Sequence, residues 1–422
     1  MMTRPRLGTI ALWVSGMLVI NCSGQRPKNA ANRGETRPQE SVSENKKPAN
    51  SGESESTRLT PDSATYTHQM RYQKYLADHP ECADFIDTCP VPAGITWQCK
   101  RRFMHGVNYA WHNFGSDFGG GSQWGSAGVA GTPAIANELA DMKAHGTNVV
   151  RWWIFPDLRG DGIILDSNGT PRGLGGSFIA DLNAALELAE RNDLYLMLTI
   201  FSFDAFRPSS GAAGRVIPSL RPIVVDAAKR QALLDNVIAP MAAAAEASPN
   251  KNRLIAWDII NEPEWAISGK SLYGDPDFDP IAGLETVSHE QMQTFLAEVG
   301  STLRAKSKAL VSVGAAAVKW KHAWRNLDLD FHQFHIYDWV NQYWPYHKSP
   351  SDLGIGDKPV VMGEFPLNGL TGASVHEMLT SWLGNAYAGG LSWSVTDPTF
   401  KWHENKSSHL PFARAKACEL SF

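Results

Sequence analysis

The sequence predicts a (β/α)8 barrel (TIM barrel), a fold in which eight parallel strands alternate with helices. Short apolar runs alternate with longer amphipathic segments from about residue 103 onward, and this alternation indicates parallel strands joined by helical crossovers. Eight such units fit into about 320 residues, which is within the usual size of one barrel domain. Polar residues stand at the carboxyl ends of several runs, where the loops of a barrel form its variable face.

The predicted strands are the apolar runs 103–109, 148–155, 194–203, 254–261, 309–315, 331–337, 359–365 and 391–395. Amphipathic periodicity predicts helices between them at 133–144, 178–192, 227–247, 290–307 and 375–388. The crossovers after the fifth and sixth strands show a weaker helical pattern. A doubly wound sheet fits less well, because it would more often show fewer strands and the sequence lacks a glycine-rich phosphate-binding signature.

Residues 1–22 resemble an export signal. Arg4 and Arg6 form a basic start, and residues 7–20 are an apolar run that is too short to span a bilayer comfortably. The segment ends in Val-Ile-Asn-Cys, which resembles a bacterial lipobox and predicts acylation of Cys22, although the residue before the cysteine is not the usual small one. The alternative is an ordinary secretory signal with Cys22 free or disulfide-bonded.

Residues 23–65 are predicted to be a disordered tether. This segment contains no aromatic residue and mixes Lys, Arg, Glu, Ser, Asn, Pro and Gly. Such a composition cannot bury enough apolar surface to offset the entropy lost on ordering. Residues 66–422 are expected to form the barrel with a cysteine-containing N-terminal extension. We expect an exported protein, either a cell-surface or outer-membrane lipoprotein or a secreted or periplasmic one.

Setting Cys22 aside leaves Cys82, Cys89, Cys99 and Cys418. An even number of cysteines in an oxidising compartment favours two disulfides, and the sequence does not choose among the three ways to pair them. If all of them pair, one bridge must tie Cys418 to the segment before the barrel. A zinc site is disfavoured because the spacing contains no C-x-x-C pair.

The composition limits the class of partner. The chain has 39 Lys and Arg against 43 Asp and Glu, a net charge of −4, which gives no field that would gather nucleic acid or an anionic membrane. We therefore expect no nucleic-acid partner, and a membrane contact through the N-terminal anchor alone. The 15 Trp residues exceed what core packing usually requires, and indole rings stack well on sugar rings. A closed barrel has no sheet edge to cover, so we expect a monomer.

Two glutamates stand at the ends of otherwise apolar strands, where an ionisable group is costly to bury. Glu262 follows the fourth run within Asn-Glu-Pro, and Glu364 lies in the seventh run within Gly-Glu-Phe. Strands four and seven face each other across the mouth of a closed barrel. Facing carboxyl groups suit glycoside hydrolysis, in which one donates a proton and the other attacks the sugar. For either glutamate taken alone, a structural ion pair at the rim with Arg151 or a nearby Lys would be the favoured interpretation, and the whole set of strand-end residues reverses that preference.

The strand-end motifs resemble those of the clan A retaining β-glycosidases, in particular glycoside hydrolase family 5, the family of cellulases and mannanases. The resemblance covers the whole barrel at the level of strand ends, and short segments align. It implies that Glu262 is the acid/base and that Glu364 is the nucleophile, held in place by Arg151. It also implies that Asn261 binds the 2-hydroxyl group of the reacting sugar.

The same resemblance gives supporting roles to residues of strands six and eight. His335 and Tyr337 correspond to the family's His-x-Tyr, and the Tyr337 hydroxyl can steady the nucleophile. Trp393 corresponds to the floor of the reacting subsite. Taken alone, His335 could be a satisfied buried histidine and Trp393 could be core packing.

Electrostatics gives the two carboxyl groups different expected properties. Arg151 is predicted to lower the pKa of Glu364 and keep it a charged nucleophile, whereas Glu262 needs a raised pKa to carry a proton. The chain departs from the family after strand three, where many members carry a histidine and residues 199–204 read Thr-Ile-Phe-Ser-Phe-Asp. We expect Asp204 or a residue of another loop to substitute.

Further tryptophans are expected near the rim loops, where several of them would form a platform for a chain of sugars. They are Trp111, Trp124, Trp152, Trp265, Trp339, Trp344 and Trp402.

The sequence therefore predicts a retaining O-glycosyl hydrolase of the endo-β-mannanase or endo-β-glucanase type, which acts on β-linked polysaccharides or oligosaccharides. Two glutamates suffice for this chemistry, so we expect no metal and no organic cofactor. One alternative is an exo-acting β-glycosidase or a transglycosylase of the same clan. Another is a non-catalytic cell-surface lipoprotein that binds glycans.

Overall fold

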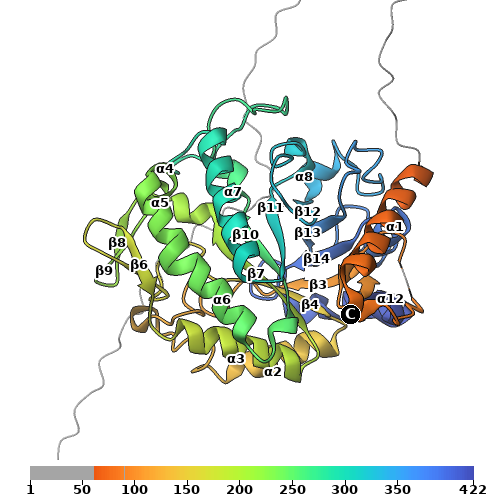
Figure 1. Ribbon diagram of the computed structural model, residues 1–422, viewed down its shortest axis with the longest axis horizontal. Coiled ribbons are helices and arrows are strands. Elements are labelled where there is room, and N and C mark those ends of the chain that lie inside the picture. Colours follow the sequence, from red (N-terminus) through yellow and green to blue (C-terminus); the bar gives the residue numbers. More distant parts are fainter. Residues whose placement is uncertain (1–60, 90) are drawn as a thin grey trace, which may run out of the picture. The chain divides into compact units, whose positions relative to one another are not determined.

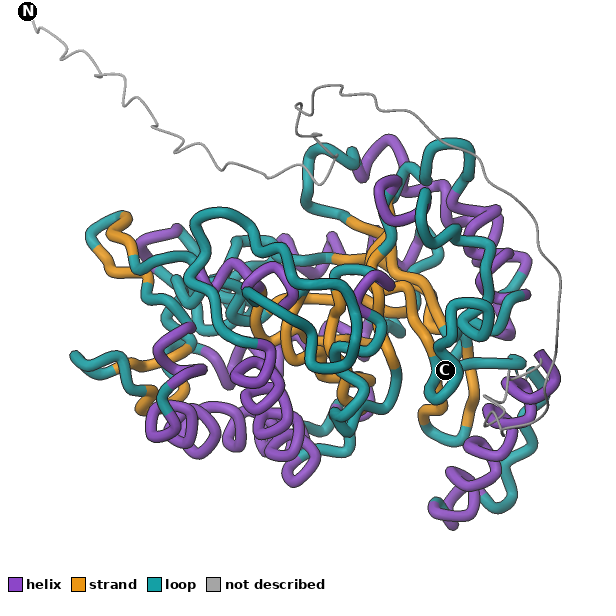
Figure 2. Tube along the Cα trace, turned by 90° about the horizontal axis from the view of Figure 1, so that it is seen from above, coloured by secondary structure: helices purple, strands orange, loops and turns teal. Residues whose placement is uncertain are grey.

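The computed structural model describes residues 61–89 and 91–422, which form a closed eight-stranded barrel surrounded by helices (Figure 1). The barrel strands follow each other in chain order, all neighbours are parallel, and the last strand pairs with the first. Seen from above, the helices lie outside the strands (Figure 2). The predicted (β/α)8 barrel is confirmed. The predicted signal peptide with Cys22, and residues 23–60 of the predicted tether, lie outside the described residues.

The eight barrel strands coincide with the eight predicted apolar runs. Parallel strands that are covered on both faces read as continuous apolar sequence, which explains the agreement. The strands are β3 (Met104–Asn108), β4 (Val149–Trp153), β7 (Tyr195–Ser202), β10 (Leu254–Asn261), β11 (Leu310–Ala315), β12 (His332–His335), β13 (Val360–Pro366) and β14 (Gly389–Trp393).

The predicted helices are also present. They are α2 (Ala134–Ala144), α3 (Phe178–Arg191), α5 (Ala227–Leu233), α6 (Ala239–Ala247), α7 (His289–Lys306) and α9 (Val375–Gly384), with a π turn between α5 and α6. The two weak crossovers hold only short elements, a 3-10 turn (Val318–Trp320) after β11 and the one-turn helix α8 (Asp338–Asn341) after β12.

Shorter strands and helices lie outside the barrel in the described part of the chain. Three antiparallel hairpins stand outside it, and further helices precede and follow the strands. The hairpins are β1 (Ile95–Trp97) with β2 (Lys100–Arg102), β5 (Ile163–Leu165) with β6 (Pro171–Leu174), and β8 (Ser210–Ala212) with β9 (Arg215–Ile217). The helices are α1 (Pro61–Asp78), α4 (Arg221–Val225), α10 (Trp402–Asn405), α11 (Leu410–Ala415) and α12 (Ala417–Leu420).

One predicted boundary is wrong. Helix α1 begins at Pro61, inside the segment 23–65 that the sequence assigns to the tether. Proline suits the first turn of a helix, because the first N–H groups have no partner within the helix. Further along the helix, the buried Tyr72 donates its hydroxyl to the carbonyl of Cys99 at 2.7 Å. Among the described residues, none of the helices combines the length and apolar character needed to cross a bilayer.

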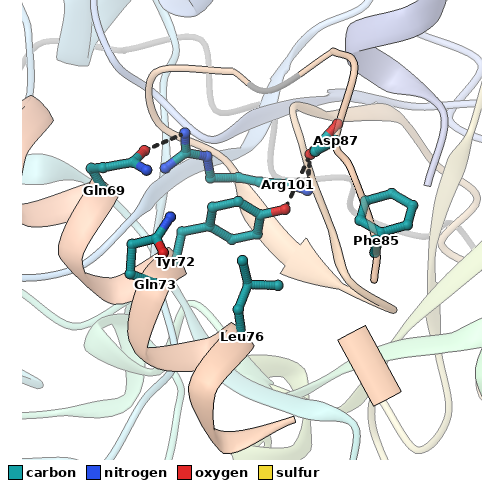
Figure 3. Close-up of a pocket in the computed structure, with 7 residues that line it drawn as sticks. All are labelled: Gln69, Tyr72, Gln73, Leu76, Phe85, Asp87 and Arg101. Atoms are coloured by element: carbon teal, nitrogen blue, oxygen red, sulfur yellow. Dashed lines mark hydrogen bonds between the residues drawn. The ribbon is translucent and has the colours of Figure 1, made fainter. Parts of the chain in front are cut away.

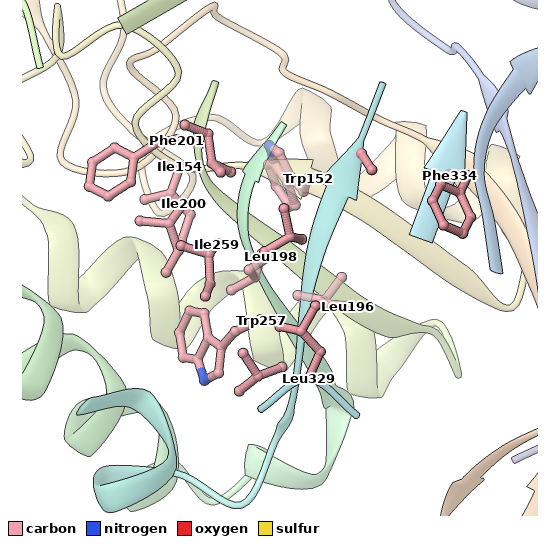
Figure 4. Packing of buried hydrophobic residues seen from close by; sticks show 14 of the residues in the cluster. Trp152, Ile154, Leu196, Leu198, Ile200, Phe201, Trp257, Ile259, Leu329 and Phe334 are labelled. Atoms are coloured by element: carbon pink, nitrogen blue, oxygen red, sulfur yellow. The ribbon is translucent and has the colours of Figure 1, made fainter. Parts of the chain in front are cut away.

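Apolar side chains fill two spaces. The larger core lies between the strands and the helices, and Figure 4 shows part of it, including Trp152, Leu198 and Trp257. A smaller cluster, which includes Met104 and Met197, fills the barrel at the amino-terminal ends of its strands. The carboxyl-terminal ends are left for polar side chains.

Two disulfides cross-link the segment before the barrel, one within that segment and one to the C-terminal helix α12. Cys82 pairs with Cys99, and Cys89 pairs with Cys418 across 329 positions of sequence. The prediction of two disulfides is confirmed, and so is the bridge from Cys418 to the segment before the barrel. The second bridge brings the C-terminal helices next to the N-terminal extension.

A pocket lies between α1 and the β1–β2 hairpin (Figure 3). The guanidinium of Arg101 stacks over the ring of Tyr72 at 4.7 Å and donates to Gln69 at 3.0 Å. Because β2 leads directly into β3, this pocket lies toward the amino-terminal ends of the strands, the side that contributes stability in barrels of this class. Its lining residues are Gln69, Tyr72, Gln73, Leu76, Phe85, Asp87 and Arg101.

Candidate active site

Glu262 directly follows β10 and turns the chain out of the barrel. Its backbone is left-handed, with φ 49° and ψ 52°. Non-glycine residues adopt this conformation rarely, and such residues cluster at functional sites. Its N–H donates to the carbonyl of Gly314 near the end of β11 at 2.6 Å, and Pro263 opens a 3-10 turn (Pro263–Ala266). The fold thus holds a buried carboxyl group at the carboxyl-terminal rim.

Glu364 lies on β13, and its two oxygens have different partners. Nη1 of Arg151 donates to Oε1 at 2.8 Å, and the hydroxyl of Tyr337 donates to Oε2 at 2.9 Å. Arg151 comes from β4 and Tyr337 from the residues after β12. Three separate elements therefore fix the orientation of this carboxyl group, and the structure brings together the three residues that the sequence placed at it.

The two glutamates meet on either side of His335. Nδ1 of His335 lies 2.7 Å from Oε1 of Glu262 and 3.5 Å from Oε2 of Glu364. This nitrogen and one oxygen of each glutamate all lie within 4.8 Å of one another. Retaining glycoside hydrolases hold their carboxyl groups about 5 Å apart, whereas inverting ones need about 6.5–9.5 Å to admit a water molecule. The short separation favours direct attack of one carboxylate on a sugar.

Arg151 is fully buried, and each of its five N–H groups has an acceptor. Nε and Nη2 donate to Oδ2 of Asp258 at 2.9 and 2.7 Å, and Nη2 also donates to Oδ1 of Asn261 at 2.9 Å. Nη1 donates to Oδ1 of Asn108 at 2.8 Å in addition to Glu364. The saturated guanidinium is a rigid support for the carboxylate.

Burial raises the pKa of Glu262 to about 7. The hydrogen bond from Nε1 of Trp265 to Oε2 at 2.8 Å and the charge of Arg151 oppose this rise, while the charge of Asp204 adds to it. A carboxyl group with such a pKa is protonated in weakly acidic water, so Glu262 is equipped to donate a proton.

Burial also raises the pKa of Glu364, so the expected net lowering is wrong, although the charge of Arg151 acts in the predicted direction. The charges of His335 and Arg151 oppose the rise, and the charge of Glu262 adds to it. Arg151 does not prevail because the loss of water is large and because the same guanidinium also pairs with Asp258. The arginine limits the rise without reversing it.

His335 is buried, and burial lowers its pKa to about 4. Together with Glu262 and Glu364 it offers ligand atoms that are close enough to hold a metal ion. Both carboxylates also have partners outside this group, because Glu364 accepts from a guanidinium and a tyrosine hydroxyl and Glu262 accepts from Nε1 of Trp265.

Aromatic rings lie on two sides of the site. Trp393, half-buried at the end of β14, has its ring centroid 5.4 Å from that of Trp153 and 6.1 Å from that of Trp111. On the other side the centroids of Trp265 and Trp339 lie 6.2 Å apart. Half-buried indole rings can stack on sugars.

Two tryptophans that the sequence placed at the rim belong to the core instead. Trp152 and Trp402 are buried, and each donates its Nε1 to an aspartate. Side chains alternate along a strand, so Trp152 points toward the helices because Arg151 points into the barrel. The other expected rim tryptophans, Trp111, Trp124, Trp265, Trp339 and Trp344, are partly exposed.

Asp204 stands where the chain departs from the family pattern. It lies in the 3-10 turn Phe203–Phe206 directly after β7, and Arg207 donates to it at 2.8 Å. Burial raises its pKa, and its charge acts on Glu262. Its substitution for the family's histidine stays a prediction.

Sequence reasoning missed three buried polar residues of the site, Asn108, Asp258 and Glu264. The carboxylate of Glu264 accepts hydrogen bonds from the N–H of Ala316 at 3.0 Å and from Nε1 of Trp324 at 2.7 Å, which fastens the turn after β10 to the chain after β11. Asn108 and Asp258 interrupt apolar strands, and that interruption was a usable signal. Glu264 has no such mark, because it follows the strand in a polar turn.

A closed barrel that holds two glutamates this close together at the carboxyl ends of its strands has the site geometry of a retaining glycoside hydrolase. This chain is a glycoside hydrolase, and it is similar to family 5. No protein-family model matches it.

The relatives and solved structures are in keeping with this class. The chain is 28% identical over 342 residues to a mannan endo-1,4-beta-mannosidase of Mytilus edulis, covering 73% of this chain and 88% of the relative. It is 26% identical over 330 residues to a mannan endo-1,4-beta-mannosidase of Cryptopygus antarcticus, covering 70% and 80%. The beta-mannanase structure from Mytilus edulis superposes with a TM-score of 0.61 at 24% identity, covering 76% of this chain and 95% of that one. The endo-1,4-beta-mannanase structure from Eisenia fetida gives 0.59 at 25% identity, covering 72% and 89%.

Proposed function

We propose that this protein is an endo-acting β-mannanase, which cleaves internal linkages of β-1,4-linked mannan with retention of configuration. The substrate is supported by the two curated relatives, both mannan endo-1,4-beta-mannosidases that align over most of their length. The observation that carries the mechanism is the close approach of the carboxyl oxygens of Glu262 and Glu364, within 4.8 Å.

In the first step, Glu262 gives its proton to the glycosidic oxygen while a carboxylate oxygen of Glu364 attacks the anomeric carbon. The bond from that carbon to the glycosidic oxygen breaks, and the leaving part of the chain departs as an alcohol. A covalent ester then joins the sugar to Glu364. The raised pKa of Glu262, about 7, keeps the proton available for this step.

In the second step, Glu262 acts as the base. Its carboxylate takes a proton from a water molecule, whose oxygen attacks the anomeric carbon and displaces Glu364. Glu262 is protonated again and Glu364 is again a free carboxylate. Two inversions at the same carbon give net retention.

The surrounding residues have supporting roles in this proposal. Arg151 and Tyr337 hold one oxygen each of the nucleophile, and His335 contacts the acid/base. Because Oδ1 of Asn261 accepts from Arg151, its amide nitrogen is directed to donate to a sugar hydroxyl. Trp393 would stack beneath the reacting sugar.

The test is hydrolysis by the secreted domain, from about residue 61, and by its Glu364→Ala variant. Both are assayed on β-mannan, β-glucan, xyloglucan and aryl β-glycosides by release of reducing ends. Wild type is expected to act on β-mannan, and the variant is expected to lose essentially all activity because no nucleophile remains. Glu404→Ala, an exposed glutamate on α10, is the matched control and should keep full activity.

Three outcomes separate the alternatives. An initial product of inverted configuration, read by NMR, would contradict the double displacement. Mannose or mannobiose released from the chain end as the sole early product would indicate an exo-acting enzyme. Transfer of the sugar to a sugar acceptor would indicate a transglycosylase. Silence on every substrate together with glycan binding would favour a non-catalytic glycan-binding protein.

We also propose that the protein is exported as a lipid-anchored monomer, with the glycan as its partner. Two disulfides, Cys82–Cys99 and Cys89–Cys418, support an oxidising compartment. The lipobox-like end of residues 1–22 supports the anchor. A Cys22→Ser variant of the full chain should leave the membrane fraction in cells, and its retention there would contradict the anchor.

A further inference from the structure

We propose that Asp258 is a positioning residue of this site, which shares the charge of Arg151 with Glu364 and fixes the guanidinium against the nucleophile. The inference rests on the proposed role of Glu364. It goes beyond that role because it assigns control of the nucleophile to a residue that does not touch the substrate.

Asp258 reaches the barrel interior through an irregularity in β10. Residues three apart on a regular strand point to opposite faces, yet Asp258 and Asn261 both accept hydrogen bonds from Nη2 of Arg151. The pairing of β10 with β11 shifts register between these two residues, and the intervening Ile259 and Ile260 both pack in the outer core. The shift delivers two acceptors to one guanidinium.

A single oxygen of Asp258 carries its hydrogen bonds. Oδ2 accepts from Nε and Nη2 of Arg151 at 2.9 and 2.7 Å, from the hydroxyl of Thr199 at 3.0 Å and from Nε2 of Gln333 at 3.3 Å. Oδ1 is buried without a hydrogen-bond partner among the described residues. The residue is fully buried, so this carboxylate faces the arginine with little screening by water.

The guanidinium therefore lies between two carboxylates. Asp258 binds the Nε and Nη2 side and Glu364 binds Nη1 at 2.8 Å, while the remaining acceptors, Asn108 and Asn261, are neutral. The single positive charge of Arg151 is thus shared between the carboxylates of Asp258 and Glu364. If Asp258 were neutral, Arg151 would pair with Glu364 alone and stabilise its ionised form more strongly.

The other groups that face Glu364 do not change in this comparison. They are Glu262, whose charge raises the pKa of Glu364, and His335 and Tyr337, which lower the pKa of Glu364. The acidic limb of the pH dependence of kcat/KM follows ionisation of the nucleophile in the free enzyme. A shift of this limb therefore reports the charge that Asp258 withdraws from Arg151.

The test is the variant Asp258→Asn in the secreted domain, assayed on β-mannan from pH 3 to 9. The asparagine keeps the shape and one acceptor but removes the charge. We expect the acidic limb of kcat/KM to move to lower pH by about one unit or more. We also expect kcat to fall with less change in KM, because a more stable carboxylate is a weaker nucleophile and the substrate is not contacted.

Two further variants complete the test. Asp181→Asn removes another fully buried aspartate, which accepts from the N–H of Gly119 at 2.8 Å on the outer side of the barrel, and should lower stability without moving the limb. Asn108→Asp adds a carboxylate to Nη1 of Arg151 and should move the limb to higher pH. The two substitutions change the charge near Arg151 in opposite directions. One folded variant, at either Asp258 or Asn108, is therefore enough to test the inference.

An unchanged limb in a folded Asp258→Asn or Asn108→Asp protein would overturn the inference and leave Asp258 a structural residue. If wild type itself hydrolyses no glycan, the proposed function fails first. The pKa of Glu364, followed by carboxyl-carbon NMR in wild type and Asp258→Asn, then still tests the inference, and equal values in the two proteins would overturn it.

Discussion

Two glutamates that are almost equally buried differ in their partners, and this difference divides their roles. Glu262 is 6% exposed and receives one N–H from Trp265, whereas Glu364 is 4% exposed and receives a guanidinium and a hydroxyl. Burial raises the pKa of both, and the charge of Arg151 opposes the rise in both, but Arg151 donates a hydrogen bond to Glu364 alone. The proposed mechanism requires Glu364 ionised and Glu262 protonated, so kcat/KM should follow a bell-shaped curve whose alkaline limb lies near pH 7.

The alkaline limb should respond to Trp265→Phe. Nε1 of Trp265 donates to Oε2 of Glu262 at 2.8 Å, and this bond favours the charged form. Its loss should raise the pKa of Glu262 and move the alkaline limb of kcat/KM to higher pH by up to about one unit. Measured pH profiles of wild type and variant on one soluble substrate check this shift.

Trp402→Phe is the control for that experiment. It removes an indole hydrogen bond to Asp141 at 2.8 Å on a helix outside the barrel. The control should leave both limbs in place. A limb that moves to lower pH in Trp265→Phe would contradict the assigned direction.

At the scale of elements, irregular strand pairing delivers the polar side chains to the site. The pairing of β12 with β13 shifts between Phe334 and His335, so that Gly363 is skipped and Glu364 pairs with His335. A Cβ atom on Gly363 would lie 2.4 Å from Cγ of Gln333. The glycine before Glu364 is thus needed for close packing inside the barrel.

We therefore expect Gly363→Ala to destabilise the protein by about 1–3 kcal/mol, the usual cost of overpacking a core, and to lower kcat because Glu364 must shift. Denaturant unfolding and initial rates measure both effects. The matched control is Gly384→Ala at the end of α9, where a Cβ would meet nothing within 4 Å. That change should be neutral or stabilise by up to about 1 kcal/mol. Equal effects of the two substitutions would contradict the packing argument.

The sequence predicted the regular part of this architecture and little of its irregular part. Parallel strands buried on both faces are visible as apolar runs, and rim residues such as Glu262 follow those runs directly. Register shifts leave no mark in the sequence, so the meeting of Asp258 and Asn261 at Arg151 could not be foreseen. The rim hairpins β5–β6 and β8–β9 are three- and four-residue strands whose pattern is too short to detect.

At the scale of the whole molecule, the two disulfides should differ in their effect on stability. Cys82–Cys99 closes a separation of 17 residues and Cys89–Cys418 one of 329. The chain-entropy model gives about 3 kcal/mol for the short loop and about 6 kcal/mol for the long one. Replacing both cysteines of a pair by serine should therefore lower the free energy of unfolding more for Cys89 and Cys418, as measured by denaturant titration. Greater loss in the other pair would contradict this ordering.

Acid stability should depend on a buried histidine pair between the barrel and the C-terminal segment. Nε2 of His105 on β3 lies 3.0 Å from Nδ1 of His409, whose Nε2 lies 2.9 Å from the hydroxyl of Ser392 on β14. Burial lowers the pKa of His105 to about 4 and lowers that of His409 well below its usual value. The unfolded chain binds protons below about pH 6.5 that the folded protein cannot bind. Stability from this pair is therefore complete above pH 6.5 and is lost as the pH falls toward 4.

The variant His409→Gln should lose less stability than wild type when the pH is lowered. Glutamine keeps hydrogen-bonding capacity without a titrating ring, so the variant should be less stable than wild type at pH 8 and should lose less on acidification. A shift from 6.5 to about 4 corresponds to about 3 kcal/mol for one histidine over that range. Glu262 and Glu264, whose pKa burial raises to about 7, change stability with the opposite sign, so the quantity to compare is the difference between variant and wild type. The control is His347→Gln, which changes an exposed histidine. The free energy of unfolding is measured at pH 8, 6 and 4.5. If it falls by the same amount on acidification in His409→Gln and in wild type, the histidine pair is not the cause of the acid sensitivity.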